Sequence, residues 1–416
     1  MNIGYEGFAL GVNETDFKDW NLENSNEDNL MEIISCHLKY LGKLLDYNTA
    51  HDIGFYCLDS KMISFGPNQH IELPWWEIFS SEFNNLGKKM SEAKIRISMH
   101  PDKLNLLSVI NEDVSSDAVK CLNHQAKIFK ALNLGTEHKI IIQLGDIDSG
   151  KKEGLEKFKK IFSGLDKAVQ MRLALMNDER QYNIQEVISL GKSLDLPVVF
   201  HNRNHLKNPP IHGKEELDWI RECKKTWKEI DGVQIVYYAE LTLGKPVDSI
   251  DETIGIKSFL EFYEKMDSTL DIMLEANDRN LSAIKCINCI RKEKDIKLLE
   301  LEWRKYKYTV LENSHRAYLQ IRSLLKEKNQ YPAVSFYLLI EEALAGKKRE
   351  GFVNAAQHVW GYFKKCATEI EKRDLLMMME EYKTGKIKME VIKKKLWELS
   401  VKYEMKYLLE SYYFIL

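Results

Sequence analysis

The sequence predicts a (β/α)8 barrel followed by an all-helical domain. Over roughly the first 285 residues, short apolar runs alternate with longer stretches whose apolar residues recur at helical spacing. Eight short runs can be placed, and eight parallel strands that alternate with helices close into a barrel. An open doubly wound sheet is the alternative, but the first expected strand lacks the glycine-rich turn of dinucleotide-binding sheets.

The expected elements of the barrel follow from the switch between these two periodicities. The expected strands are residues 2–5, 53–58, 95–100, 139–144, 173–176, 197–201, 233–238 and 271–275. The expected helices between them are residues 30–48, 77–91, 114–134, 154–171, 184–194, 214–229 and 256–265.

The alternation stops after Glu275, and from Lys297 onward the pattern is helical throughout. Pro332, Gly346 and Gly351 are the clearest breaks between helices in this part. We therefore expect a barrel domain over residues 1–290 and a helical domain over residues 296–416, separated by a short charged run.

The overall composition gives no bulk signature of nucleic-acid binding. The 416 residues include 60 basic and 63 acidic side chains, a net charge of -3, so any DNA contact must come from a local patch. Seven cysteines, an odd number in a long chain, fit a reducing compartment better than a disulfide framework. No basic leader and no membrane-length apolar run is present. We expect a cytoplasmic protein without a membrane partner.

Two motifs resemble functional sites without meeting their chemistry. Residues 145–152 have the glycine and lysine spacing of a phosphate loop, but Lys152 stands where Ser or Thr must hold Mg²⁺. Cys286 and Cys289 form a lone CxxC on an expected helix, without a second pair at zinc-ligand spacing. We interpret the first as an ordinary βα loop and the second as two thiols on one helix face.

Potential metal ligands gather at the carboxyl ends of the expected strands. His100 ends the third strand, directly before Pro101, which cannot continue a sheet. His201 and His205 come at the end of the sixth strand, and Glu275 ends the eighth. A carboxylate and imidazoles from separate strand ends are how a barrel builds a metal site at its carboxyl-terminal face. Other side chains at these ends are poor ligands for a divalent hydrolytic metal: Gln143, Met176 and Tyr237.

Several short motifs lie at or near the expected strand ends: Gly4-Tyr5, Ser98-Met99-His100-Pro101, Leu144-Gly145 with Lys151, residues 175–180, residues 197–200, Thr226-Trp227 and Leu274-Glu275-Ala276. Together they are similar to the UV-damage endonuclease family, barrels related to endonuclease IV. The resemblance implies a protein that nicks DNA beside pyrimidine dimers and abasic sites with a cluster of divalent metals.

The resemblance also shows departures among the ligands it implies. His100 and Glu275 match the family's first histidine and final glutamate. Gln143 stands where the family has its second histidine, Met176 where it has a bridging glutamate, and Tyr237 where it has the histidine of the seventh strand. The aspartate that ends the sixth strand in the family is His201 here. Of the family's paired histidines, the first is Asn204 and the second is His205. The family's His-Ala-Asp motif reads Asp-Ser-Ile at residues 248–250.

Two further departures concern contacts with DNA. The glutamine-aromatic pair that wedges into the duplex in the family is Lys103-Leu104 here, and Phe8 replaces an asparagine on the first loop. The resemblance assigns DNA or partner contacts in the barrel to five positions: Tyr5, Lys103, Leu104, Lys151 and Asn177.

These departures predict that a full multi-metal cluster is not formed, because neutral amide and thioether groups do not offset the repulsion between adjacent divalent cations. A reduced site is one hypothesis. His100, His201 and Glu275 would hold a single divalent ion, Mn²⁺ or Zn²⁺, with His205 as an additional ligand.

The second domain is similar to a small helical family of unknown function that is associated with photolyase-type genes. The resemblance rests mainly on residues 351–365. Asn354, Gln357 and His358 share one helix face there, bordered by Lys364 and Lys365. This face is either a surface that binds DNA or a partner, or a buried polar cluster that braces aromatic helices. Basic residues interleaved with aromatics over residues 383–397 also suit single-stranded nucleic acid.

Three functional hypotheses follow from the sequence. The chain is a DNA-damage-associated protein that binds DNA or a repair partner without the family's cleavage. Alternatively, it is a metal-dependent endonuclease with a reduced site that nicks UV-damaged DNA. In the third hypothesis the barrel serves a small-molecule ligand, since barrels change chemistry by changing loop residues.

Overall fold

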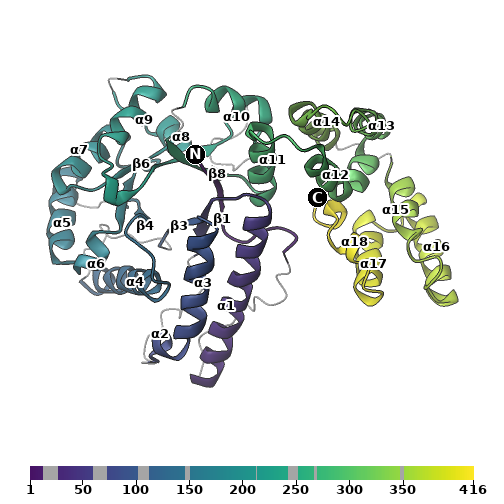
Figure 1. Cartoon of the computed structure of the whole chain (residues 1–416), viewed down its shortest axis with the longest axis horizontal. Helices are drawn as coiled ribbons and strands as arrows, with labels where there is room; N and C mark the ends of the chain where they lie inside the picture. Colours follow the sequence, from purple (N-terminus) through teal and green to yellow (C-terminus); the bar gives the residue numbers. More distant parts are fainter. Residues whose placement is uncertain are drawn as a thin grey trace. The chain divides into compact units, whose positions relative to one another are not determined.

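The computed structural model describes residues 1–12, 27–59, 73–101, 112–145, 150–211, 213–241, 252–266, 269–346 and 351–416. The chain divides into two compact units, residues 1–287 and 288–416, and each is described here by itself (Figure 1). Lys103, Leu104 and residues 248–250 lie outside the described residues, so the predictions made for them stay predictions.

The first unit is a closed barrel of eight parallel strands in sequence order, which confirms the predicted fold class. All eight expected strands are present, because each is a short apolar run with nearly every residue buried. They are β1 Ile3–Glu6, β2 Phe55–Leu58, β3 Arg96–Met99, β4 Lys139–Ile142, β5 Leu173–Met176, β6 Val198–His201, β7 Gln234–Ala239 and β8 Leu270–Glu275.

The helices connect these strands around the barrel (Figure 1). The two expected helices at residues 77–91 and 154–171 are each divided in two, the second because Leu165 and Asp166 adopt extended backbone angles. The helices are α1 Glu27–Ala50, α2 Trp75–Ile78, α3 Ser80–Glu92, α4 Glu112–Ala131, α5 Lys151–Gly164, α6 Lys167–Gln170, α7 Ile184–Leu194, α8 Asn202–Lys207, α9 Glu216–Lys224, α10 Ile256–Tyr263 and α11 Asn280–Ile290, with a 3-10 turn η3 Glu229–Asp231.

The interior of the barrel is filled by side chains from its strands, among them Phe55, Cys57, Ile141, Met176 and Tyr237. Close strand packing explains one of the family motifs. A Cβ atom at Gly4 would lie 2.2 Å from the carbonyl oxygen of Phe55 on β2, so only glycine fits at this position.

Buried charges close the amino-terminal end of the barrel. Arg96 on β3 donates to the carbonyls of Glu137 and Asp231, both at 2.8 Å, and pairs with Asp271 at 3.1 Å. Lys139, which is fully buried, donates to Asp231 at 2.5 Å. These charges lie at the amino-terminal ends of the strands, opposite His100 and Glu275. We call this closed end the floor of the barrel and the open carboxyl-terminal end its mouth.

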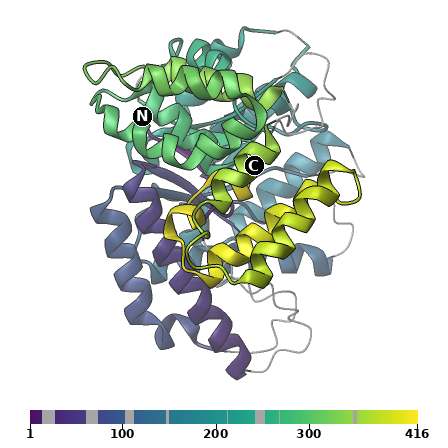
Figure 2. The same ribbon diagram turned by 90° about the vertical axis from the view of Figure 1, so that its right-hand side faces the viewer.

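The second unit is entirely helical, as predicted (Figure 2). Its core is formed by buried residues such as Phe352, Val359, Leu396 and Tyr413. A buried ion pair between Glu312 and Lys393, 3.1 Å apart, connects the helices that contain them. The elements are α12 Ile296–Asn313, α13 His315–Leu324, α14 Ala333–Ala345, α15 Phe352–Trp360, α16 Glu369–Lys383, α17 Met389–Lys402, α18 Lys406–Leu409 and a 3-10 turn η4 Tyr412–Phe414. Among the described helices, none is long and apolar enough to span a membrane.

The sealed floor leads to a stability prediction. Asp231→Ala leaves the buried Lys139 ammonium without its carboxylate, so we expect the free energy of unfolding to fall by about 3–5 kcal/mol in urea denaturation. The matched control is Asp218→Ala, which removes an exposed carboxylate paired with Arg221 on α9 and should cost less than about 1 kcal/mol. An equal loss of unfolding free energy in the two variants would contradict a stabilising role for the buried charges of the floor.

Candidate functional site

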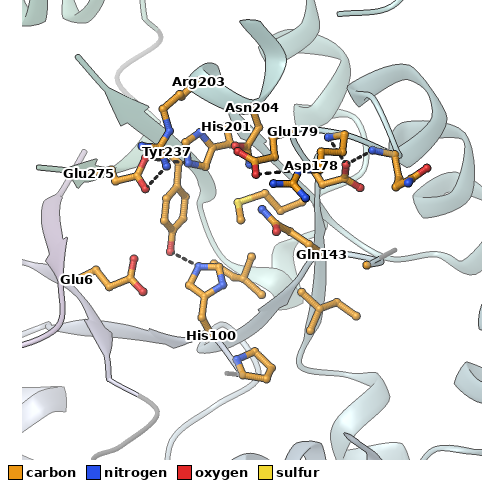
Figure 3. A pocket seen from close by; sticks show the side chains of 17 residues that line it. Glu6, His100, Gln143, Asp178, Glu179, His201, Arg203, Asn204, Tyr237 and Glu275 are labelled. Carbon is orange, nitrogen blue, oxygen red and sulfur yellow. Dashed lines mark hydrogen bonds and ion pairs between the residues drawn. The ribbon is translucent and has the colours of Figure 1, made fainter. Parts of the chain in front are cut away.

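A cavity of about 650 Å³ opens at the carboxyl ends of the strands (Figure 3). The positions where the resemblance implied metal ligands at the strand ends all line this one cavity: His100, Gln143, Met176, His201, Tyr237 and Glu275. The remaining lining residues are Glu6, Pro101, Ile141, Ile142, Gly145, Asp178, Glu179, Arg180, Gln181, Arg203 and Asn204.

Glu275 at the end of β8 is held by two partners, the guanidinium of Arg203 and the imidazole of His201. Arg203 Nη2 donates to Glu275 Oε1 at 2.6 Å, and His201 Nε2 lies 3.2 Å from Glu275 Oε2 (Figure 3). Burial raises the pKa of the Glu275 carboxyl, but the contact with His201 and the charges of His201 and Arg203 more than offset this, so its pKa lies below the ordinary value. Glu275 is therefore an ionised carboxylate that already has a fixed counter-ion.

Three buried asparagines hold the backbone that carries this group. Asn177 exchanges hydrogen bonds with the backbone N–H and C=O of His201, at 2.9 and 3.1 Å. Asn202 does the same with Ala239 at the end of β7, both at 2.9 Å. Asn204 donates to the carbonyl of Asn177 at 2.9 Å. Because β6 passes directly into α8, these bonds fix where α8 places Arg203 over the mouth.

His100 and Tyr237 form a second pair across the cavity. His100 Nε2 lies 2.7 Å from the hydroxyl of Tyr237, and their rings meet edge to face (Figure 3). Burial and the neighbouring His201 lower the pKa of His100 to about 4, so the imidazole is neutral near pH 7. Burial raises the pKa of Tyr237 far above its ordinary value, so its phenol stays protonated. The pair is uncharged.

Glu6, which ends β1, lines the same cavity. Although the Glu6 side chain is exposed to the cavity, desolvation by the surrounding barrel and the carboxylates of Glu275 and Asp59 raise its pKa to about 7. A substantial fraction of Glu6 is therefore protonated at neutral pH, in contrast to Glu275 in the same cavity.

Comparison with known proteins shows which family the chain belongs to. A family model described as UV-endonuclease UvdE matches residues 11–304, more than two thirds of the chain. The chain belongs to the UV-endonuclease family. A second family model, described as a protein of unknown function (DUF1722), matches residues 307–416, the helical unit. Both resemblances that the sequence motifs predicted are thereby confirmed.

Relatives within this family are named for action on damaged DNA. A "UV DNA damage endonuclease" of Clostridium perfringens is 29% identical over 357 residues, which is 84% of each chain. Because that share exceeds the barrel unit, the match extends into the helical unit. A protein of the same name from Bacillus cereus (strain G9842) is 25% identical over 73% of this chain and 99% of its own. The crystal structure of SacUVDE superposes with a TM-score of 0.65 at 26% identity, covering 70% of this chain and 98% of the other.

The side chains at the mouth do not fit the family's metal cluster. Gln143, Met176 and Tyr237 offer an amide, a thioether and a protonated phenol, none of which balances the charge of a divalent ion. In the described parts of the chain, no three His, Cys, Asp or Glu side chains are grouped so that they could hold a metal.

The members of the predicted single-ion site contact other side chains in this structure, and the ion itself stays a prediction. Glu275 pairs with Arg203, whose positive charge repels a metal ion, and His100 contacts Tyr237. His205 does not line the cavity; its ring packs against Phe200, 5.2 Å between centroids.

Three predicted DNA contacts in the barrel are explained by packing or pairing. Tyr5 is fully buried and donates to Asn48 at 3.0 Å. Asn177 is buried as well and accepts a hydrogen bond from the backbone N–H of His201. Neither side chain offers a surface to DNA in this structure, and the two DNA contacts stay predictions. Lys151 begins α5 and pairs with Glu186 at 2.9 Å on the surface.

In the helical unit, the predicted polar face is on the outside. Asn354, Gln357 and His358 are exposed on α15, and the alternative of a buried polar cluster is therefore wrong. Lys364 and Lys365 are also exposed, in the turn that follows the helix.

Sequence reasoning missed Arg203 and Glu6. The signal for Arg203 was its place two residues after His201, inside a strand-to-helix junction. For Glu6 it was a carboxylate at the end of the first strand, the barrel edge where the other candidates were sought.

The raised pKa of Glu6 predicts a pH-dependent stability. The folded state keeps the Glu6 proton up to about pH 7 whereas the unfolded chain releases it near 4.5, so this group lowers stability as pH rises across that window. We expect Glu6→Gln to raise the melting temperature relative to wild type more at pH 8 than at pH 5. Glu92→Gln, on the surface of α3, should give the same small difference at both pH values. A Glu6→Gln difference that does not change with pH would contradict the assignment.

Proposed function

We propose that the barrel binds DNA at its mouth without the multi-metal cleavage of its family, and that Arg203 supplies the positive charge there. The observation that carries this proposal is the ion pair between Arg203 and Glu275. A guanidinium is permanently charged and cannot activate a water molecule as a metal ion does. The proposal therefore gives the mouth a cationic group for phosphate and no metal-bound hydroxide for cleavage.

Unused hydrogen-bond donors support the binding of a phosphodiester. Arg203 Nε and Nη1 have no hydrogen-bond partner among the described residues, although both atoms are buried. Arg203 also lines the cavity, together with Arg180. Buried donors without acceptors are costly, and a phosphate oxygen satisfies them with charge-assisted bonds.

A small-molecule ligand is a second candidate because of the size of the site. A cavity of about 650 Å³ lies within the range of small-molecule pockets. The neutral pair of His100 and Tyr237 and the protonated fraction of Glu6 would then supply the polar contacts on its wall.

Two substitutions at the ion pair should change DNA affinity in opposite directions. Arg203→Ala removes the donors and should weaken binding to UV-irradiated duplex DNA by about tenfold. Glu275→Gln removes the competing carboxylate and should strengthen it several-fold, on the order of one charge-assisted hydrogen bond. Both are measured by fluorescence anisotropy on the full-length protein, with irradiated and unirradiated duplexes compared at one salt concentration.

Glu261→Gln, an exposed carboxylate on α10 outside the cavity, is the matched control and should leave affinity unchanged. The same samples are tested for nicking with added Mn²⁺. Nicking that requires Mn²⁺ and disappears in Glu275→Gln would contradict the proposal and support the reduced-site endonuclease. No affinity for either duplex would contradict it in favour of the small-molecule ligand.

A further inference from the structure

The helical unit gathers three tyrosines and two cations from four segments. Tyr318 lies on α13, Tyr362 follows α15, and Tyr407 lies on α18. Arg304 and Lys307 come from the middle of α12. These five residues are called the tyrosine surface below. No single sequence motif contains this combination, because its members are spread over about one hundred residues, from Arg304 to Tyr407.

The aromatic rings of this surface are stacked and held in place. The rings of Tyr362 and Tyr407 lie 5.5 Å apart and within 13° of parallel. The buried Tyr308 fixes Tyr362 by donating to its hydroxyl at 2.9 Å. Tyr362 keeps 37% of its surface exposed. The stack therefore ends in an exposed ring, onto which a further flat ring can pack.

Cations lie beside the stack. The Arg304 guanidinium is 5.1 Å and the Lys307 ammonium 4.7 Å from the centre of the Tyr407 ring. Neither forms an ion pair with an acidic side chain of the described residues, in contrast to Lys305 next to them, which pairs with Glu302. Both charges are thus available to an anionic ligand that reaches the stack.

Three of the four segments that form the surface are depleted of acidic residues, whereas the segment around Tyr407 includes Glu404 and Glu410. Residues 303–311, 313–326 and 351–368 contain no Asp or Glu, yet they contain eight Lys and Arg residues. In the whole chain acidic residues outnumber basic ones, 63 to 60. The exposed Asn354, Gln357 and His358 lie within the third segment, a few residues before Tyr362.

We infer that the tyrosine surface binds single-stranded DNA. An exposed ring at the end of a stack accepts an unpaired base, whereas the bases of a duplex are stacked on each other and unavailable. Arg304 and Lys307 neutralise the neighbouring phosphates, and the polar face of α15 provides hydrogen-bond partners along the strand. This binding goes beyond the function proposed for the barrel and does not depend on it.

The inference is tested with full-length protein and a fluorescein-labelled 15-mer of thymidine, by anisotropy over a range of NaCl concentrations. Tyr362→Ala should weaken binding by about tenfold, whereas Tyr362→Phe, which keeps the ring and loses only the hydroxyl, should bind as wild type does. Arg304→Gln/Lys307→Gln should weaken binding and reduce the slope of log affinity against log salt by about 1.4, for two phosphates on a single strand.

Lys292→Gln/Lys294→Gln is the matched control for charge. These exposed lysines precede the amino end of α12, whereas Arg304 and Lys307 lie about 12 and 17 Å beyond that end along the helix. This control should bind as wild type does. No binding of the 15-mer by wild type at low salt, or equal losses in the control and in Arg304→Gln/Lys307→Gln, would overturn the inference.

Discussion

A buried carboxylate at the mouth of this barrel requires a cation, and the chain provides its own. Glu275 and Arg203 form an ion pair whose second carboxylate oxygen faces His201. Removing charges from water is costly unless they are paired and hydrogen-bonded, so this pair constrains every neighbouring group. Burial and the neighbouring His201 keep His100 neutral beside Tyr237, and burial together with the charge of Glu275 keeps a proton on part of the Glu6 population at neutral pH.

The position of the pair depends in turn on backbone geometry. This geometry is fixed by the hydrogen bonds that Asn177, Asn202 and Asn204 form at the ends of β5, β6 and β7. Several residues that match the family motifs hold the barrel strands in place. Gly4 allows β1 and β2 to approach, and Thr226 and Trp227 both hydrogen bond to the backbone of Val198. Residues that match the family motifs thus position the mouth, while the departures that the resemblance implies lie among the residues that line it.

The fold could be predicted because parallel barrel strands are buried on both faces and leave continuous apolar runs. The gathering of His100, His201 and Glu275 at one mouth could also be predicted, since all parallel strands end at the same edge. The side chains that these three residues contact could not be predicted. Arg203 reaches Glu275 only because a short helix follows β6 without a loop, and a pattern of strand ends does not determine such a turn. The burial of Tyr5 and Asn177 could not be predicted either, because a motif shared with a family does not distinguish packing from binding.

The central claim is that Arg203 occupies the electrostatic place of a metal ion beside Glu275. Crystals grown with excess MnCl₂ and measured at the manganese absorption edge test it most directly. We predict no anomalous density at the barrel mouth and an intact ion pair between Arg203 and Glu275. An anomalous peak at coordination distance from Glu275, with Arg203 displaced, would contradict the account.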